Sequence, residues 1–233
     1  MQQLVIDGLT VTVERKAIQN MYLRLKKPDG HVAVTCPSRT TDREIRAFVR
    51  EKRRWIDTHQ ARMQARPDLQ AHAYVTGEQL PVWGELWTLE VRPIQENCGY
   101  ITGRDGRLLL EVGPSTAEQR EGVVDEWYRR QMKRAIPPLL ERCQKRTGLT
   151  VDRWQVRKMS SRWGSCNPAA RSITLNLALA KYPPECLEMV LYHELTHLLE
   201  GSHNARFYRY LESFCPNWRQ ADAILKGKTP GPG

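Results

Sequence analysis

The sequence lacks any hydrophobic run that is long enough to cross a bilayer. Its apolar stretches are only a few residues long, whereas a transmembrane helix needs about 20. The first residues, MQQLVIDGLTVTVERK, contain no apolar core of signal-peptide length. We therefore expect a cytoplasmic protein that makes no contact with a membrane.

Paired cysteines are missing as well. The six cysteines are scattered without a CxxC pair, so their spacing excludes a cysteine-based zinc ribbon and gives no sign of a disulfide framework. A Walker loop and a dense carboxylate cluster for Mg²⁺ are also absent. What is present is a globular composition of 233 residues, 40% hydrophobic and 27% charged, which suffices for one large domain or two small ones.

Positive charge is in excess. The formal charge is +10, which favours anionic partners such as nucleic acid or nucleotides. Residues 43–66 hold eight Arg and Lys against three acids. A solvated helix face accounts for such a run more often than a binding surface does, and we find no interleaved aromatics that would favour nucleic acid. Nucleic-acid binding through the basic N-terminal half remains an alternative.

Residues 1–113 are predicted to form a β-rich domain with one helix. The helix begins at Thr41, which forms a capping box with Glu44, and it ends before Pro67. Turns are expected at Pro28-Asp29-Gly30 and Asp105-Gly106. No internal repeat is evident. The expected strands are 4–13, 20–36, 79–82, 84–94 and 107–113.

Residues 114–228 are predicted to form a helix–strand catalytic domain, and 229–233 a disordered tail, so the fold class is α+β. Ser115 and Glu118 predict a capping box for a helix that Pro137-Pro138 kink or split and that ends at Gly148. The expected elements that follow are a strand over 151–158, a polar turn over 160–167, a strand over 172–180, a helix from Pro183-Pro184 to Gly201, and helices over 203–214 and 217–226.

The segment LYHELTHLLEGSHNARFY, residues 191–208, holds three of the six histidines. His193 and His197 are four residues apart, so on a helix they share one face and can bind the same metal ion. Glu194 lies beside the first of them, within reach of water on that ion. This HExxH arrangement predicts two ligands and a general base from a single helical turn.

A catalytic zinc ion needs a third protein ligand. Glu200 lies about 10 Å along a straight helix from His193, too far to join the other two. The chain therefore has to turn back, and we expect Gly201 to supply the turn that brings in His203. Glu212 is the competing third ligand, and we favour His203 because imidazole suits zinc. Another divalent transition metal is an alternative to zinc.

This ligand set predicts a hydrolase. A metal held by neutral histidines acidifies a water molecule, whose proton Glu194 accepts before the hydroxide attacks a carbonyl or phosphoryl group. The negative charge that develops needs a further donor, for which Arg206, Tyr208 and Arg162 are unranked candidates. Cys166 has no histidine motif of its own, so we do not expect it to be a nucleophile.

The segments SRWGSC, residues 161–166, and HELTHLLEGSH, residues 193–203, resemble those of the YgjP-like metallopeptidase domain, a relative of the SprT-like zincins. The N-terminal half is similar too, through FVREKRRWI and GELWTLEV, so the resemblance covers nearly the whole chain. It implies a zincin-like catalytic domain and a zinc-dependent hydrolase, with His193, His197 and His203 as ligands and Glu194 as the base. Tyr208 stands where the family often has tryptophan.

The resemblance also implies candidate substrates. Zincins generally bind an extended peptide along an edge strand, for which 172–180 is the expected strand. The family includes enzymes described as nucleoside triphosphate (UTP) pyrophosphatases, and Arg157, Lys158, Arg162 and Arg206 would then cradle phosphates. Peptide-bond hydrolysis is our favoured function and nucleotide pyrophosphate hydrolysis the alternative. A nucleic-acid-associated protein, with a structural or DNA–protein-directed metal site, is a third hypothesis.

Overall fold

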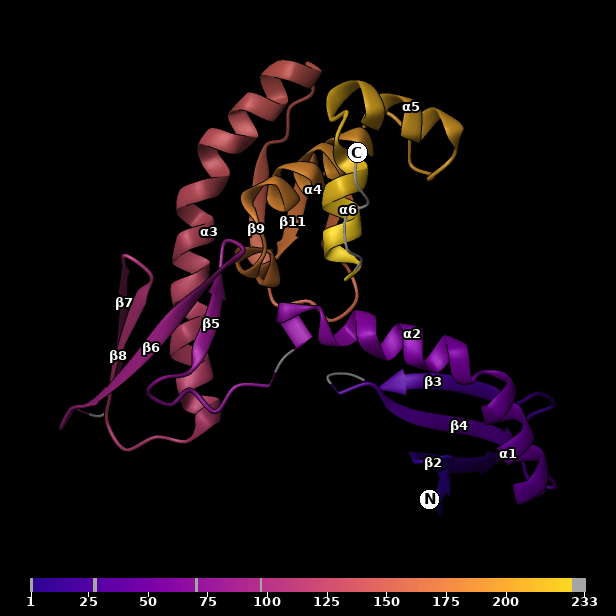
Figure 1. Cartoon of the computed structure of the whole chain (residues 1–233). Helices are drawn as coiled ribbons and strands as arrows, with labels where there is room; N and C mark the ends of the chain where they lie inside the picture. The colour runs from indigo at the N-terminus through magenta and orange to yellow at the C-terminus, as the bar shows by residue number, and fades with distance from the viewer. Residues whose placement is uncertain (1, 27–28, 70, 97, 228–233) are drawn as a thin grey trace. The chain divides into compact units, whose positions relative to one another are not determined.

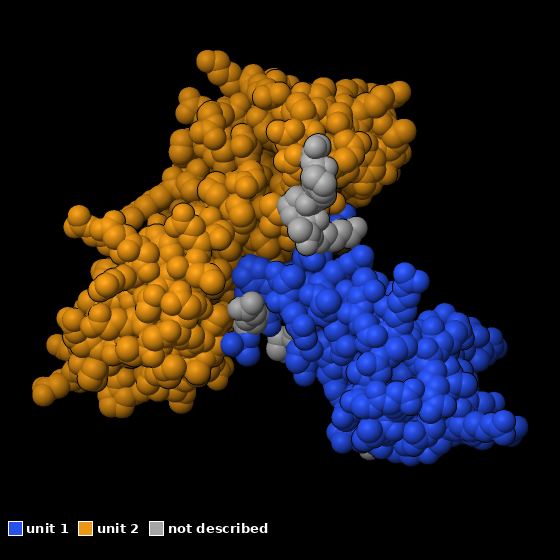
Figure 2. All heavy atoms as spheres, viewed as in Figure 1, with its two compact units in different colours: residues 1–71, 226–228 blue, residues 72–225, 229–233 orange. Residues whose placement is uncertain are grey.

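The computed structural model describes residues 2–26, 29–69, 71–96 and 98–227 (Figure 1). Within them the chain is an α+β protein with three sheets and six α-helices, in line with the predicted class. Figure 2 colours its two compact units: unit 1, residues 1–71 with 226–228, and unit 2, residues 72–225 with 229–233. The predicted domain boundary at 113 therefore falls within unit 2, and the predicted tail lies outside the described residues.

Unit 1 is a four-stranded sheet with two helices. The strands run in the order β1-β2-β4-β3, where the central pair is parallel and both outer pairs are antiparallel. Alternate strand residues, among them Val13 and Val34, form a separate hydrophobic core with Ile45, Val49 and Ile56. The elements are β1 (Gln2–Ile6), β2 (Leu9–Lys16), β3 (Tyr22–Lys26), β4 (His31–Pro37), α1 (Asp42–Glu51), α2 (Arg53–Gln64) and a 3-10 helix, η1 (Pro67–Leu69).

The single helix predicted in this unit is in fact two helices. The capping box is confirmed, because the Thr41 hydroxyl accepts from the Glu44 N–H while the Glu44 carboxylate accepts from the Thr41 N–H. The break comes at Lys52, which ends α1 and precedes α2. The spacing of the apolar residues does not reveal this break, because Ile56 lies about three helical turns after Ile45 and both side chains are buried.

Unit 2 begins with a second four-stranded sheet, which leads into the long helix α3. Its strand order is β5-β6-β8-β7. β5 matches the predicted strand 79–82, and the predicted turn at Asp105-Gly106 joins β7 to β8 with left-handed φ at both residues. β7 was not predicted. The elements are β5 (Gln79–Val82), β6 (Glu85–Pro93), β7 (Gly99–Arg104), β8 (Arg107–Val112) and α3 (Ala117–Thr147).

The two four-stranded sheets share one topology, so the expectation that the chain has no internal repeat is wrong at the level of the fold. In each sheet two antiparallel hairpins meet through a central parallel pair. The first hairpins have the same register with numbers shifted by 76, since Gln3 pairs with Thr12 and Gln79 with Thr88. Few identities persist along the chain, which is why the sequence pattern hides the repeat.

Helix α3 is not split at Pro137-Pro138, where a kink or a split was predicted, and it continues from Ala117 to Thr147 (Figure 1). Its capping box is formed by Thr116 and Gln119, one residue later than predicted. An interior proline costs about 3 kcal/mol or more. Eight side chains of α3 are buried, and each large apolar one contributes about 1.5–3 kcal/mol, so packing outweighs the cost.

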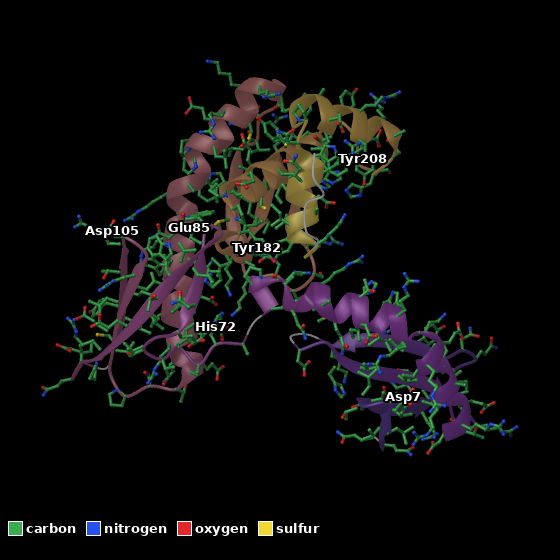
Figure 3. All side chains as sticks on the ribbon, in the orientation of Figure 1. Asp7, His72, Glu85, Asp105, Tyr182 and Tyr208 are labelled. Atoms are coloured by element: carbon green, nitrogen blue, oxygen red, sulfur yellow. The ribbon has the colours of Figure 1, made fainter. Side chains whose placement is uncertain are left out.

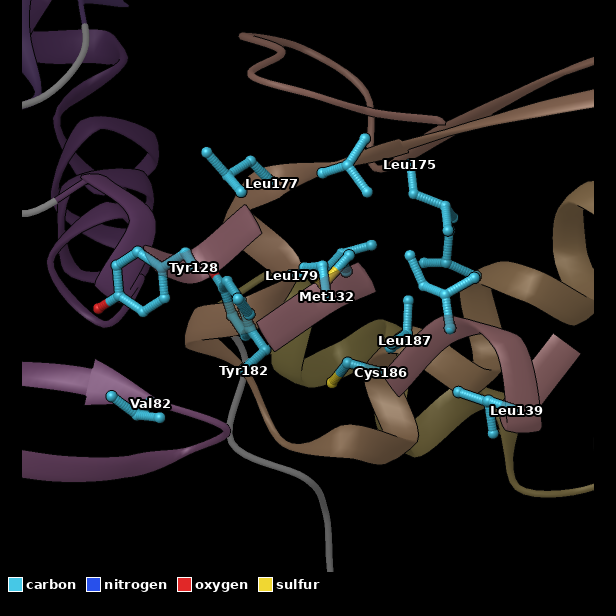
Figure 4. Packing of buried hydrophobic residues seen from close by; sticks show 14 of the residues in the cluster. Val82, Tyr128, Met132, Leu139, Leu175, Leu177, Leu179, Tyr182, Cys186 and Leu187 are labelled. Atoms are coloured by element: carbon cyan, nitrogen blue, oxygen red, sulfur yellow. The ribbon is translucent and has the colours of Figure 1, made fainter. Parts of the chain in front are cut away.

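The second half of unit 2 joins α3 and the second sheet in one hydrophobic core, part of which Figure 4 shows. Its sheet has the order β10-β11-β9. None of the helices in the described part of the chain is long and apolar enough to cross a membrane. The elements are β9 (Arg153–Arg157), β10 (Gly164–Asn167), β11 (Ser172–Asn176), a 3-10 helix, η2 (Leu177–Lys181), α4 (Pro184–Thr196), α5 (Ala205–Phe214) and α6 (Trp218–Leu225).

The structure corrects one turn prediction and one strand prediction in this region. The predicted polar turn over 160–167 contains β10, and the predicted strand over 172–180 ends at Asn176, whose side chain caps η2. Leu177 and Leu179 are buried in a 3-10 helix, so their alternation mimics a strand. Moreover, β11 is the middle strand of its sheet and has no free edge, whereas β10 is an outer strand.

Candidate metal centre

The end of helix α4 shapes the site. α4 ends at Thr196, and His197 is its C-cap, so the second histidine of the HExxH motif sits where the chain leaves the helix. Leu199 and Glu200 both donate their N–H groups to the Thr196 carbonyl. Gly201, which was expected to end the helix, has no left-handed φ, so this backbone turn reverses the chain in its place.

The turn brings three histidine rings together. Ligand atoms of His193, His197 and His203 all lie within 4.8 Å of one another, and the Nε2 atoms of His193 and His203 are 2.9 Å apart. A tetrahedral metal with bonds of about 2.0–2.1 Å separates its ligand nitrogens by roughly 3.3 Å. The cluster therefore has the size of a three-histidine metal site.

Phe207 packs against all three rings. Its centroid lies 4.9 Å from the His193 centroid, 4.7 Å from that of His197 and 4.8 Å from that of His203, and it is fully buried. Asn204 caps α5 by accepting from the Phe207 N–H, among others, and so sets where this ring lies. The histidine spacing indicates neither Phe207 nor Asn204, although an Asn before a helix is an N-cap signal.

The backbone of the turn orients His197. Its Nδ1 atom lies 3.1 Å from the Glu200 carbonyl oxygen, which requires a proton on Nδ1 and leaves Nε2 as the acceptor. Burial lowers the pKa of His197, the Glu200 bond opposes this effect, and the neighbouring His203 lowers the pKa further. The net direction favours the neutral imidazole that a metal requires.

Glu194 is a buried carboxylate beside this cluster. It is 4% exposed, and its Oε2 atom has no hydrogen-bond partner among the described residues. Burial raises the pKa of Glu194 to about 8, against the opposing charge of Arg162. An unpartnered buried carboxylate oxygen is costly unless a bound group completes it. Three imidazoles with this orphaned oxygen fit a metal ion and its water.

A glycine in β10 leaves room for that carboxylate. A Cβ atom on Gly164 would lie 2.5 Å from Oε1 and 2.8 Å from Cδ of Glu194. Real Cβ atoms do not approach so closely, so any side chain at this position would displace Glu194. The sequence analysis noted the SRWGSC segment through its resemblance, and this contact gives the physical reason for its glycine.

Asn176 holds the loop that precedes β10. The residue is 4% exposed, and its amide donates to the carbonyls of Met159 at 2.9 Å and Arg162 at 2.8 Å. Its backbone N–H donates to the Trp163 carbonyl at 2.9 Å. These bonds tie the loop to the end of β11 and so fix the backbone that carries Arg162. The sequence analysis treated Asn176 as an ordinary strand position.

Two predicted donors lie near the cluster. Arg162 acts on Glu194 through its charge. Tyr208, labelled on α5 in Figure 3, is 38% exposed, and its ring centroid is 6.4 Å from that of His203. The Tyr208 ring also stacks on Trp218, with centroids 5.4 Å apart, which limits how freely it can turn.

Arg206 and Glu212 point to other partners. The Arg206 guanidinium lies 3.4 Å from the Tyr210 hydroxyl. Glu212 accepts from the Trp218 ring N–H at 2.7 Å and from Arg219, and these bonds lower its pKa. Glu212, the alternative third ligand, therefore stands outside the histidine cluster.

Two of the residues proposed to cradle phosphates, Lys158 and Arg157, already have side-chain partners. Lys158 donates hydrogen bonds to Glu121 at 2.7 Å and to Asp125 at 2.8 Å, and Arg157 donates to the Gln155 side chain.

Burial and the charge of Glu194 raise the pKa of Cys166 to about 11, so it is a protonated thiol.

Comparison with known proteins agrees with the resemblance. The YgjP-like, metallopeptidase domain family matches residues 19–228. No curated protein matches the chain. The crystal structure of the metallopeptidase zymogen of Pyrococcus abyssi, abylysin, is 25% identical over 38% of this chain and 87% of that chain, with a TM-score of 0.34. From the match over residues 19–228 and a histidine cluster that can hold a metal, the chain belongs to the YgjP-like metallopeptidase family.

Proposed function

We propose that the protein is a zinc-dependent peptidase of zincin type, with His193, His197 and His203 as ligands and Glu194 as general base. One observation carries the proposal: three imidazoles form a cluster of metal-site size, and the residue that follows the first of them, Glu194, has a buried carboxylate with an unpartnered oxygen. A structural zinc site would be completed by a fourth protein ligand. The described part of the chain supplies three, which supports a catalytic role.

The chemistry follows from these side chains. When bound, zinc supplies a Lewis acid that polarises the scissile carbonyl and acidifies water. Glu194 accepts the proton of the attacking water and passes it to the leaving amine. Its burial, which raises its pKa, favours a group that takes up and releases a proton near neutral pH. Arg162 and Tyr208 are the candidate donors to the developing negative charge.

An extended peptide has a strand to pair with in β10. The Trp163 carbonyl accepts from the Asn176 N–H, so Trp163 bonds towards β11. Along an antiparallel strand, residues whose N–H and C=O groups bond to the neighbouring strand alternate with residues whose groups face the opposite side. Gly164 and Cys166 consequently direct their N–H and C=O groups to the outer edge, beside Glu194. We propose β10 as the substrate strand, in place of the predicted 172–180.

The nucleotide pyrophosphatase alternative retains less support. Of the four predicted phosphate-binding cations, only Arg162 acts on Glu194. Lys158 already neutralises two carboxylates, which would have to be released before it could hold a phosphate.

One experiment tests the proposal. Zinc-loaded protein is offered a peptide library and a panel of nucleoside triphosphates, alongside Glu194→Gln, His197→Ala and the control Glu185→Gln, an exposed position on the same helix. We expect peptide cleavage that falls by about 100-fold or more in Glu194→Gln, because general-base catalysis contributes about that much. Zinc should stay bound in Glu194→Gln and be lost from His197→Ala.

Undiminished turnover in Glu194→Gln would overturn the assigned base. Hydrolysis of nucleoside triphosphates without cleavage of any peptide would replace the peptidase with the alternative.

A further inference from the structure

Unit 1 carries most of the net positive charge of the chain. Residues 1–71 contain fourteen Lys and Arg against eight Asp and Glu, whereas residues 72–225 contain twenty against eighteen. The first sheet of unit 2 has the same topology as that of unit 1, so this arrangement of strands does not require an excess of cations. The excess in unit 1 points to an anionic partner.

The acids of unit 1 are occupied by its own cations. Six of them form ion pairs, and the remaining two accept hydrogen bonds from Thr41 and from the His31 backbone. Within the described residues, Arg54 and Arg62 of α2 form no ion pair. The pairs are Arg50–Asp7, Lys16–Glu14, Arg15–Asp42, Lys52–Glu51, Arg53–Asp57 and Arg66–Asp68.

A cavity of about 490 Å³ opens beside α2, and we call it the Trp55 pocket. None of the described residues that line it is acidic. Its volume lies within the range of about 300–1,000 Å³ that small-ligand sites occupy. Three cations and an aromatic pair therefore share one concave surface. The lining residues are Leu25, Trp55, His59, Arg62, Met63, Arg66 and Lys226.

An aromatic stack stands at the centre of this lining. The rings of Trp55 and His59 are stacked, with centroids 4.1 Å apart and an interplanar angle of 28°. The His59 ring is held by a 2.9 Å bond between Nδ1 and the Trp55 carbonyl, yet Trp55 remains 42% exposed. Trp55, His59 and Arg62 share one helical face. Residues 43–66 therefore do contain aromatic rings among their cations, and the prediction that they lack interleaved aromatics is wrong.

We propose that the Trp55 pocket binds single-stranded nucleic acid, with a base on the Trp55–His59 stack and an adjoining phosphate on Arg62. Sequence-tolerant single-strand sites combine these two features. A duplex exposes phosphates but hides the base faces, so it leaves the aromatic stack without a role. An acidic peptide satisfies the cations and lacks a planar group for Trp55.

The test measures binding of a labelled 15-residue oligo(dT) to the full chain by fluorescence anisotropy. Trp55→Leu is compared with Tyr22→Leu, an aromatic of unit 1 that is 49% exposed, and Arg62→Gln is compared with Arg43→Gln, which removes the same charge from α1. We expect Trp55→Leu to weaken binding by about 5-fold or more, since stacking of one base contributes at least that much. Arg62→Gln should lower the slope of log Kd against log salt by about 0.7.

The proposal fails if the pocket variants bind no more weakly than their controls, or if poly-glutamate displaces the oligonucleotide as well as unlabelled oligo(dT) does. Should Trp55→Leu not fold, photocrosslinking of bromodeoxyuridine oligonucleotide to the wild-type chain decides, because the crosslink has to map to α2. Glu194→Gln should bind oligo(dT) unchanged, which separates this proposal from the peptidase.

Discussion

The two four-stranded sheets of the chain are built alike and packed differently. Their first hairpins turn at Asp7-Gly8 and Trp83-Gly84, and all four residues have left-handed φ. A Cβ on Gly84 would lie 2.7 Å from Pro183 at the start of α4, whereas one on Gly8 would meet nothing within 4 Å. The turn conformation is therefore the same in both hairpins, and the second hairpin packs closely against the start of α4, the helix that carries His193.

The helices that follow the two sheets also differ, in their length and in how many side chains they bury. α3 is one helix of 31 residues, with eight side chains buried in the core shared with α4. The first copy has two shorter helices, which bury only Ile45, Val49 and Ile56 in a core of its own. We infer that one scaffold serves in unit 2 as a support for catalysis and in unit 1 as a carrier of a charged surface.

The largest effect is expected from Gly164→Ala. The added methyl group would displace the Glu194 carboxylate, so peptide cleavage should fall by about 100-fold or more, as for loss of a general base. Unit 1 should be untouched, and oligo(dT) binding measures this. Gly122→Ala is the control, since Gly122 has no left-handed φ and its Cβ would meet nothing within 4 Å, and equal activity of the two variants would contradict the assignment.

Asn176→Ala should act on both stability and catalysis. It removes the amide that donates to the Met159 and Arg162 carbonyls in two part-buried hydrogen bonds, and each such bond contributes about 0.5–1.5 kcal/mol. Denaturant unfolding should show this loss, while kcat/KM falls because Arg162 is no longer fixed. Asn217→Ala, at an exposed position of unit 2 outside β10, is the control, and unchanged kcat/KM in Asn176→Ala would refute the positioning role.

Gly84→Ala and Gly8→Ala test the difference in packing directly. Both place a Cβ in the left-handed region, at a cost of about 1–2 kcal/mol. Only Gly84→Ala meets Pro183, so we expect a further loss of about 1–3 kcal/mol in the free energy of unfolding. Equal losses in urea unfolding would show that the two hairpins are packed alike.

The smallest effect concerns the two capping boxes, Thr41 with Glu44 and Thr116 with Gln119. Thr41→Ala and Thr116→Ala should each cost about 1 kcal/mol at neutral pH. The bonds from Thr41 hold the pKa of Glu44 below its usual 4.5, so their stabilisation is present above that value and is lost as pH falls through the lowered pKa.

Gln119 does not titrate. The cost of Thr41→Ala should therefore shrink between pH 7 and pH 3 while that of Thr116→Ala stays constant. Unfolding of each variant at both pH values measures the difference, and parallel changes in the two would exclude Glu44 as its source.

Sequence patterns predicted what depends on neighbours along the chain. The capping box at Thr41, the Asp105-Gly106 turn and the strand 79–82 are local, and all three are present. The spacing of His193, His197 and His203 also sufficed to expect a common site, because a helical turn and one reversal bring them together. Glu194 as the base and zinc as the metal stay predictions.

The errors arise where distant segments meet. Of the kink or split expected at Pro137-Pro138, the split does not occur, because buried side chains on both sides hold α3 together. The alternation at Leu177 and Leu179 was taken for a strand, because burial alone does not distinguish a strand from a 3-10 helix that packs on α3. β10, with no apolar alternation, becomes a strand through its pairing with β11.

The amino-acid order by itself determined the α+β class, most helices and the presence of a three-histidine cluster, since these follow from periodicity, capping and spacing over a few turns. Only the tertiary structure decided that Gly164 lies against Glu194, that Asn176 holds the loop of Arg162 and that the strand topology is used twice. These contacts join residues that are far apart along the chain, and their energy comes from burial and hydrogen bonds that exist only when the segments are packed together.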